Sequence, residues 1–464
     1  MVMGTVLING RVVTPEETIE CDIRIENEVI ESMGKNLIKE NDKVIDVKGA
    51  YILPGAIDTH THFDLDTGTT FTADNFETGT KAAIVGGTTT ILDFATQNKG
   101  ESLEDALSNW HKKAQYKAYC DYGFHMAITD WNEKVSKDMQ LMIDEGVTSF
   151  KMYMAYKNLM VKDREIYEAL VRSKEIGGLI GFHCENGDII DALVYNARKN
   201  HKTKPYYHFK TRPACLESEA INRLASIGEV AKAPVWVVHL STEMGLKEVK
   251  KARAKGVEVV LESCPQYLLL DNSYYGKETD ESFEAAKYVM SPPLRGKNDN
   301  EALWEGIRNG DIDFLGTDHC SFNYKGQKDL GIDDFSKIPN GGPGVEHRVY
   351  LMYTYGVCEG KISINDMCRL VSTNAAKNFG LYPKKGIIQV GSDADLVILN
   401  PNSETVITKD KQTQNVDYTP YEGFKRKGSI EHVFLRGNEV VKDENFIDNS
   451  PIGIYQRRNI RQFN

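Results

Sequence analysis

The sequence predicts an α/β protein made of a (β/α)₈ TIM-type barrel and a small β-sandwich domain built from both chain ends. Two observations predict this fold. The middle of the chain alternates eight short apolar stretches with amphipathic ones, whereas both ends carry short strand-like stretches and turn signals such as Asn9-Gly10. Almost continuously apolar strands are typical of a covered parallel sheet, and hairpin signals are typical of antiparallel sheet. A chain of 464 residues is long enough for a large barrel and a minor domain.

The two chain ends are predicted to pair into the β-sandwich, with residues 1–53 as its first part and residues 381–440 as its second. Neither part shows a helix of useful length. Residues 441–464 are polar, and we expect a tail that is either disordered or reaches onto a neighbouring subunit. The expected strands of the two parts are Thr5–Ile8, Val12–Val13, Cys21–Glu26, Val29–Met33, Asp395–Asn400, Val406–Thr408 and Ile430–Arg436.

Residues 54–380 are predicted to form the barrel, because eight strand-plus-helix units in a row build a closed parallel sheet. The expected strands are Ala56–His60, Thr88–Phe94, Tyr122–Ile128, Thr148–Met152, Leu179–His183, Val235–His239, Val257–Glu262 and Ile312–Thr317. The expected helices include Asp74–Val85, Ser102–Tyr116, Ser136–Glu145, Asp163–Ile176, Leu216–Val230 and Thr242–Lys255.

Composition excludes several classes of protein. The net charge of −11 and the lack of a basic stripe argue against nucleic-acid binding. No apolar run is long enough to span a membrane, and the first ten residues do not resemble a signal peptide. Eight scattered cysteines without a C-x-x-C pair are typical of reduced thiols in a large cytosolic chain. We therefore expect a cytoplasmic protein that acts on a small molecule.

Ligand-type side chains gather at the ends of the predicted strands, where barrels of this kind carry their chemistry. His60 and His62 are two residues apart, so a strand there places both imidazoles on one side. Such a pair indicates metal binding. For Asp93 and His125 a hydrogen-bonded core position is the favoured interpretation. The polar residues at or just past the strand ends are His60, His62, Asp93, His125, Lys151, His183, His239, Glu262 and Asp318.

Six of these residues, all except Asp93, His125 and Glu262, lie within motifs that resemble dihydropyrimidinase and D-hydantoinase, members of the cyclic amidohydrolase branch of the amidohydrolase superfamily. The resemblance covers nearly the whole chain, in order. The motifs that carry it are Pro54–His62, Ser149–Lys157 (SFKMYMAYK), Gly181–Asn186 (GFHCEN), Val237–Ser241, Cys264–Asp271, Ser291–Arg295, Gly316–Phe322 (GTDHCSF) and Lys337–Glu346 (KIPNGGPGVE).

The resemblance implies two divalent metal ions, expected to be Zn²⁺, bridged by Lys151 in N6-carboxylated (carbamate) form. An unmodified lysine cannot serve, because its ammonium has no lone pair. It further implies a homotetramer. By the same resemblance the ligands of one metal are His60, His62 and Asp318, and those of the other are His183 and His239.

The resemblance also implies roles in substrate binding and catalysis. Tyr156 is expected to stabilise the oxyanion, and Asp318 to carry the proton to the leaving ring nitrogen. Ser291 and Asn340 are expected to bind the cyclic amide edge through main-chain groups. The implied reaction is hydrolytic ring opening, of 5,6-dihydropyrimidines such as dihydrouracil to N-carbamoyl-β-alanine, or of 5-substituted hydantoins to N-carbamoyl amino acids.

The chain departs from the family after His62, where Phe63-Asp64-Leu65-Asp66-Thr67 replaces the usual Leu-Asp/Glu-Met-Pro-Phe type of run. This loop shapes the pocket for the substituent of the ring, so substrate preference stays open. We expect Phe63, Leu65 and Leu159 to contact that substituent. The alternatives are an allantoinase, a dihydroorotase, and a non-catalytic dihydropyrimidinase-related scaffold protein; the six retained ligand positions speak against the scaffold.

Overall fold

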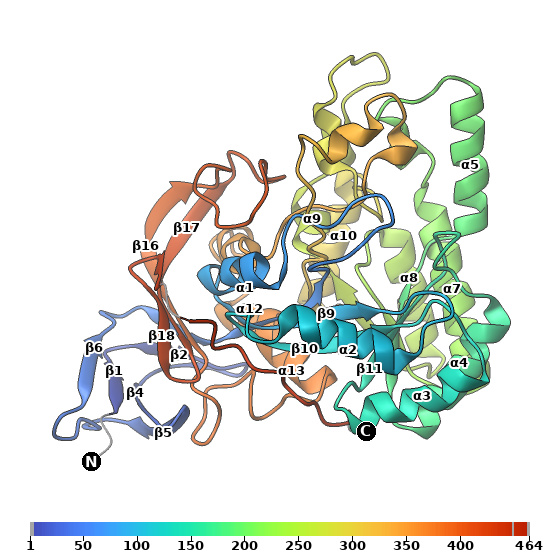
Figure 1. Cartoon of the computed structure of the whole chain (residues 1–464). Helices are drawn as coiled ribbons and strands as arrows, with labels where there is room; N and C mark the ends of the chain where they lie inside the picture. Colours follow the sequence, from blue (N-terminus) through green and yellow to red (C-terminus); the bar gives the residue numbers. More distant parts are fainter. Residues whose placement is uncertain (1–3, 448–449, 462–464) are drawn as a thin grey trace.

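The computed structural model describes residues 4–447 and 450–461. A barrel of parallel strands surrounded by helices stands beside a smaller all-β domain that combines the first and the last strands of the chain (Figure 1). The predicted fold class is therefore confirmed. Among the described residues, no helix is both long enough and apolar enough to cross a lipid bilayer.

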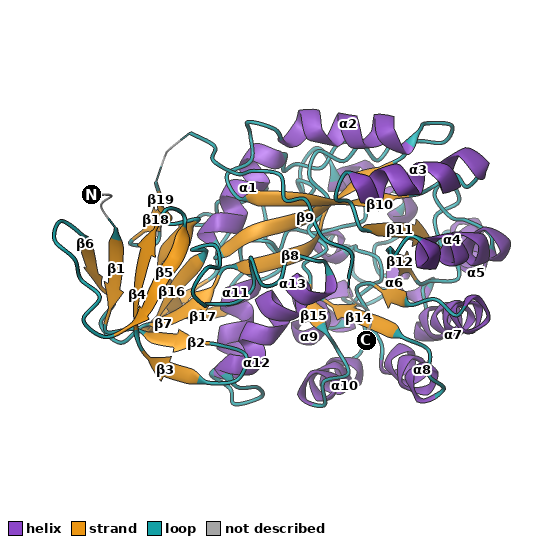
Figure 2. Ribbon diagram, turned by 90° about the horizontal axis from the view of Figure 1, so that it is seen from below, coloured by secondary structure: helices purple, strands orange, loops and turns teal. Residues whose placement is uncertain are grey.

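The barrel sheet contains eight parallel strands in sequential order, seen with their surrounding helices in Figure 2. It closes irregularly between its first and last strands, where the His62 N–H donates to the His319 carbonyl at 2.8 Å and the His319 N–H to the His60 carbonyl at 3.2 Å. The strands are β8 (Ala56–Thr61), β9 (Thr88–Thr96), β10 (Asp121–Ala127), β11 (Ser149–Tyr153), β12 (Leu179–His183), β13 (Val235–Val237), β14 (Val259–Ser263) and β15 (Phe314–Leu315).

The helices begin where short polar side chains satisfy the first free backbone N–H groups. Asn75, Asn132 and Asn186 each accept such a bond, as Ser102 and Thr242 do. The helices are α1 (Phe76–Val85), α2 (Leu103–Ala114), α3 (Glu133–Asp144), α4 (Asp163–Glu175), α5 (Gly187–Lys199), α6 (Tyr207–Lys210), α7 (Ala214–Ala231), α8 (Glu243–Ala254), α9 (Pro265–Leu269), α10 (Lys297–Arg308), α11 (Arg348–Leu351), α12 (Ile364–Cys368) and α13 (Asn374–Asn378).

The small domain consists of two sheets that enclose their own apolar core, which includes Leu7, Ile23, Ile52, Ile398 and Phe434. One sheet contains β1 (Thr5–Ile8), β4 (Asp22–Glu26), β5 (Val29–Gly34) and β6 (Lys43–Asp46). The other contains β2 (Arg11–Val13), β3 (Thr18–Glu20), β7 (Tyr51–Pro54), β16 (Leu396–Val406), β17 (Lys425–Leu435), β18 (Asn438–Lys442) and β19 (Asn445–Phe446).

Two barrel strands are shorter than the sequence predicts, and a third predicted strand does not stand alone. β13 ends at Val237, and His239 has a φ of 39°, so the backbone leaves extended geometry before the histidine. β15 covers only Phe314–Leu315, and Asp318 has a φ of 53°. The prediction of a separate strand at Val406–Thr408 is wrong, because β16 runs without a break to Val406 and bulges near Asn400.

Residues 450–461 lie against the amino-terminal ends of β10 and β11, which we call the barrel floor. The Tyr122 N–H donates to the Ile454 carbonyl at 3.1 Å, and the Gln456 N–H returns a bond to the Tyr122 carbonyl at 2.7 Å. The buried Arg458 guanidinium donates to Ser149 Oγ at 2.8 Å. This part of the predicted tail therefore packs onto the barrel of its own chain.

Candidate active site

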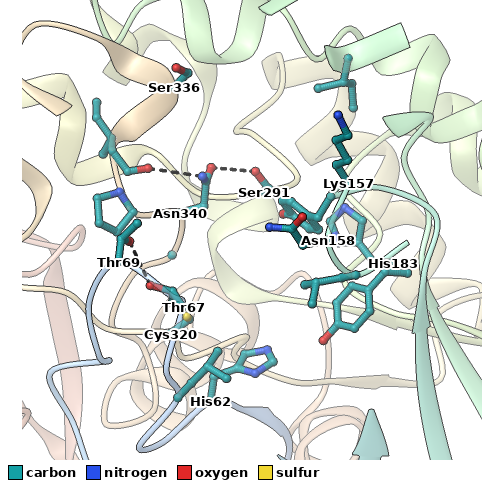
Figure 3. Close-up of a pocket in the computed structure, with 18 of the residues that line it drawn as sticks. His62, Thr67, Thr69, Lys157, Asn158, His183, Ser291, Cys320, Ser336 and Asn340 are labelled. Atoms are coloured by element: carbon teal, nitrogen blue, oxygen red, sulfur yellow. Dashed lines mark hydrogen bonds between the residues drawn. The ribbon is translucent and has the colours of Figure 1, made fainter. Parts of the chain in front are cut away.

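A cavity of about 940 Å³ opens at the carboxyl ends of the barrel strands. Figure 3 shows part of its lining, with His62 and His183 on one side and Ser291 and Asn340 on another. All but one of the residues that the sequence predicts for the site line it. They are His60, His62, Leu65, Lys151, Tyr156, Leu159, His183, His239, Ser291, Asp318 and Asn340.

His60, His62 and Asp318 form one potential metal site, since their ligand atoms all lie within 4.8 Å of one another. Asp318 Oδ1 is 3.2 Å from His60 Nε2 and 3.3 Å from His62 Nε2. Ligand atoms on a tetrahedral zinc ion lie about 3.3 Å apart when the bonds are about 2.0–2.1 Å. The buried His60 Nε2 has no hydrogen-bond partner among the described residues, so a lone pair there is available to a metal ion.

Glu262 orients His60. Its Oε1 is 2.6 Å from His60 Nδ1, and both side chains are fully buried. Burial raises the pKa of Glu262 well above its usual value, and the charge of Lys151 opposes that shift. In its carboxylate form Glu262 accepts the Nδ1 hydrogen and leaves the Nε2 lone pair directed toward Asp318. Burial lowers the pKa of His60 well below its usual value, and the charge of Lys151 lowers it further. The imidazole is therefore neutral, as a metal ligand must be.

His183 and His239 form a second group, with His183 Nδ1 only 3.0 Å from His239 Nε2. His183 Nε2 is 2.9 Å from Glu185 Oε2, an arrangement that leaves Nδ1 as the free lone pair. Arg212 Nη1 in turn donates to the same Glu185 oxygen at 2.7 Å. Burial lowers the pKa of both histidines. The donor set of this group therefore also fits a zinc-like ion.

Lys151 lies between the two groups. Its charge lowers the pKa values of His60, His183 and His239, and the rings of His60 and His239 are 5.4 Å apart. The side chain is 1% exposed, and its ammonium lies 4.8 Å from the centre of the Phe94 ring. Among the described residues no carboxylate forms an ion pair with it, and burial lowers the pKa of Lys151 to about 8.

Three residues of this site have strained backbone conformations. Tyr156, His239 and Asp318 have φ values of 67°, 39° and 53°, in the left-handed region that side-chain-bearing residues rarely adopt. Such conformations cost on the order of 1–3 kcal/mol each and persist only where surrounding contacts enforce them. At each of the three positions the turn directs a polar side chain into the cavity.

Tyr156, Ser291 and Asn340 all line the cavity. Ser291 Oγ donates to Asn340 Oδ1 at 2.9 Å (Figure 3). Burial raises the pKa of Tyr156 well above its usual value, so the phenol keeps its proton. It is therefore available as a hydrogen-bond donor in the cavity.

Apolar side chains form part of the outer wall of the cavity, beside polar ones such as Thr67 and Asn158. Leu65 and Leu159 contribute to it as the sequence predicts. Phe63 does not line the cavity, because its fully buried ring packs against Phe76 and His319 at centroid distances of 5.8 and 5.3 Å. Sequence reasoning did not identify a further group of wall residues from α5 and the segment 330–338, namely Ile190, Val194, Leu330, Phe335 and Ile338.

Sequence reasoning also did not assign the two carboxylates that hold the ligand histidines. Glu262 was visible as a polar strand end, but its partner His60 is 202 residues away in the chain. Glu185 stands two residues after His183 in the GFHCEN motif, and that spacing was the available signal.

The sequence profile described as "Amidohydrolase family" matches residues 51–440. A D-hydantoinase of Geobacillus stearothermophilus is 46% identical over 458 residues, which cover 98% of this chain and 97% of the relative. A dihydropyrimidinase of Dictyostelium discoideum is 40% identical over 445 residues, covering 95% and 88% of the two chains. The crystal structure of dihydropyrimidinase from Brevibacillus agri NCHU1002 superposes with a TM-score of 0.97 at 44% identity, covering 100% of both chains. This chain therefore belongs to the amidohydrolase family.

Proposed function

We propose that the protein hydrolyses cyclic amides, opening the ring of 5,6-dihydropyrimidines or of 5-substituted hydantoins. One observation carries the proposal: Lys151 is a buried lysine that forms no ion pair with a carboxylate of the described residues, and it lines the cavity together with His60, His62, His183, His239 and Asp318. Burying an ammonium without an ion-pair partner costs folding free energy, so a lysine in such a position indicates a functional role and not a stabilising one. The full-length similarity to hydantoinases and dihydropyrimidinases supports the same reaction.

His60, His62 and Asp318 would hold one divalent metal ion, His183 and His239 the other, and a carbamate on Lys151 would bridge them. We propose Zn²⁺ for both ions, since nitrogen and carboxylate ligands suit it. When bound, a metal pair lowers the pKa of water and polarises an amide carbonyl. Carbamate formation joins the neutral lysine amine to CO₂ and releases one proton. The lowered pKa of Lys151, about 8, makes that neutral amine accessible near neutral pH.

The chain's own residues would bind the ring and move the proton. The neutral Tyr156 hydroxyl donates a hydrogen bond to the oxygen on which negative charge develops. The Asp318 carboxylate accepts a proton from the attacking water and returns it to the leaving ring nitrogen. The main-chain groups of Ser291 and Asn340 bind the amide edge of the ring. Their backbone N–H and C=O groups make no hydrogen bond to other described residues, which supports this role.

The rival functions fit the cavity less well. A dihydroorotase needs a cation for its substrate carboxylate; the cavity-lining Arg212 is already paired with Glu185, so Lys157 or Lys337 of the lining would have to supply it. A scaffold protein has no need of ligand residues, whereas all six proposed ones lie together here. Leu65, Leu159 and the other apolar residues of the outer wall suit an apolar ring substituent better than the polar substituent of allantoin.

We also propose a cytoplasmic location and a homotetrameric assembly. All eight cysteines are free, which supports a reducing compartment. Sedimentation of the purified protein tests the assembly.

Steady-state kinetics test the proposed reaction. Purified protein loaded with Zn²⁺ is compared on dihydrouracil, 5-phenylhydantoin, allantoin and dihydroorotate. We expect turnover of the first two, with the N-carbamoyl acid as product. Preferential turnover of allantoin or dihydroorotate would instead support a rival amidohydrolase, and no turnover of any ring by fully metallated protein would support a scaffold.

A further inference from the structure

Lys328 is a buried lysine outside the proposed catalytic groups. It begins the short helix η3 (Lys328–Gly331), and its side chain is 0% exposed. Its ammonium donates to the carbonyls of Val289, Pro339 and Gly341 at 2.7, 2.7 and 2.6 Å. An ammonium has three hydrogen-bond donors, so all of them are used. Among the described residues, no carboxylate forms an ion pair with it.

The three carbonyls belong to the two loops that carry the proposed substrate groups. Val289 lies two residues before Ser291, and Pro339 and Gly341 flank Asn340. The Gly341 N–H also donates to the Val289 carbonyl at 3.1 Å. The Val289 carbonyl therefore accepts two hydrogen bonds, one from Lys328 and one from Gly341. Lys328 therefore joins the two loops at a single point just behind the residues that face the cavity.

Backbone carbonyls next to Ser291 and Asn340 accept hydrogen bonds from described residues, whereas the backbone groups of these two residues do not. Carbonyls on either side of the substrate positions accept hydrogen bonds, including that of Met290, which receives one from His208 Nε2 at 2.8 Å. The backbone groups of Ser291 and Asn340 accept and donate none within the described part of the chain. The flanking residues are thus fixed, while the two positions between them remain available to a ligand.

We propose that Lys328 is a positioning residue that sets the distance between the Ser291 and Asn340 loops, and so the fit of the cyclic amide edge. This inference rests on the proposed function, because it assumes that these two residues bind the ring. Three charged hydrogen bonds to carbonyls provide the rigidity that a preorganised site requires. Burial lowers the pKa of Lys328 to about 7. Hydrogen bonds from an ammonium to carbonyl oxygens stabilise its charged form.

The test compares Lys328→Met with Lys325→Met. Methionine keeps an apolar stem and lacks the three donors, whereas Lys325 lies on the same loop with an exposed side chain. For Lys328→Met we expect KM to rise about tenfold or more, with kcat changed much less, because ring binding is lost before chemistry. Zinc content should match the parent protein. Lys325→Met should match the parent in KM, kcat and zinc content.

Backbone amide exchange gives a readout that does not depend on turnover. Segments 286–294 and 337–344, which contain the Gly341 N–H, should exchange faster in Lys328→Met than in the parent and in Lys325→Met. Turnover of a ring by the parent protein tests the proposed function separately. An unchanged KM, or unchanged exchange in both segments, overturns the inference. If Lys328→Met does not fold, Lys328→Gln, which keeps two amide donors, takes its place; failure of both to fold shows a purely structural role and also overturns it.

Discussion

Two buried lysines at opposite ends of the barrel are placed in opposite electrostatic environments. Lys151, at the carboxyl end, has no ion pair among the described residues, and burial lowers its pKa to about 8. Lys385, at the floor, is 2.6 to 2.9 Å from Asp395, Asp121 and Asp393. Burial alone would lower the pKa of Lys385, but those three charges raise it well above its usual value. Lys151 is therefore the buried lysine that is available for chemistry, whereas Lys385 connects the barrel to the small domain.

The floor network holds three parts of the chain together. Asp121 begins β10 of the barrel, Asp395 precedes β16 of the small domain, and Gln456 of the C-terminal segment donates to Asp121 Oδ2 at 2.9 Å. Arg436 adds a further ion pair to Asp121. Although the three aspartates fit a cation geometrically, the ammonium of Lys385 already occupies the position between them.

Removing the lysine at the cavity end should abolish function and leave folding intact. For Lys151→Ala we expect loss of most bound metal and of essentially all turnover, because the bridge between the two ligand groups is gone. The thermal unfolding midpoint should change little, since no ion pair is broken. Elemental analysis, kinetics and calorimetry measure the three quantities. Parental metal content together with normal turnover would refute the bridging role, and partial rescue by short carboxylic acids would strengthen it.

Asp318→Asn separates the two roles of that residue. An amide oxygen can still reach a metal ion, but it cannot carry a proton at neutral pH. We expect most metal to be retained and kcat to fall by about 10²–10⁴-fold with a smaller change in KM. Metal content is measured on the same samples as the kinetics. Near-normal kcat would refute proton transfer, whereas parallel loss of metal and activity would leave only the ligand role.

Removing the lysine at the floor should have the reverse effect. Lys385→Met leaves three buried carboxylates without their cation, so the free energy of unfolding should fall by about 3–5 kcal/mol. Because the folded-state pKa of Lys385 is raised above the ordinary value of 10.5, its stabilisation is fully present below about pH 10 and is lost as the pH rises further. Urea unfolding at pH 7 and at alkaline pH measures both effects. Metal content and KM should stay at parental values. A fall in metal content or a change in KM without loss of stability would contradict a purely structural role for Lys385.

The smallest effect is expected at the apolar outer wall of the cavity. Shortening both Leu65 and Leu159 to alanine should change the ratio of kcat/KM on 5-phenylhydantoin to that on dihydrouracil. Discrimination by a hydrophobic pocket is worth only about 1–3 kcal/mol per methylene group. The comparison variant is Leu330→Ala, which removes another apolar side chain of the cavity lining. A ratio equal to that of the parent in the double variant would exclude the two leucines from substituent recognition.

The sequence predicted the barrel and the positions of the potential metal ligands, because strand periodicity and strand ends are local properties. β8 ends at Thr61, one residue later than expected, and β12 ends at His183 as expected. It did not predict where β13 and β15 stop, since tertiary contacts force the positive φ values of His239 and Asp318. Phe63 was misplaced because its position in the loop after β8, next to a proposed ligand, does not fix the direction of its side chain, and the ring packs into the core.

The supporting contacts behind the site could not be predicted, because they join residues far apart in the chain. Glu262 holds His60, and Lys328 holds Val289 across 39 positions. Neither pair leaves a periodic signal. The polarity of the C-terminal segment indicated a tail, yet Arg458 is 4% exposed, because its guanidinium finds acceptors at Ser149 and Phe124.

The position of Arg458 has a consequence for biosynthesis. A ribosome delivers all eight barrel strands, and then the second half of the small domain, before it delivers the segment that fills the floor. Until that segment emerges, Asp121 lacks its bond from Gln456, and Ser149 lacks its bond from Arg458. A nascent barrel therefore has an uncovered floor that chaperones and proteases can reach. Covering of the floor follows synthesis of the barrel and of the small domain, and the rate of that step sets how long each new chain stays vulnerable.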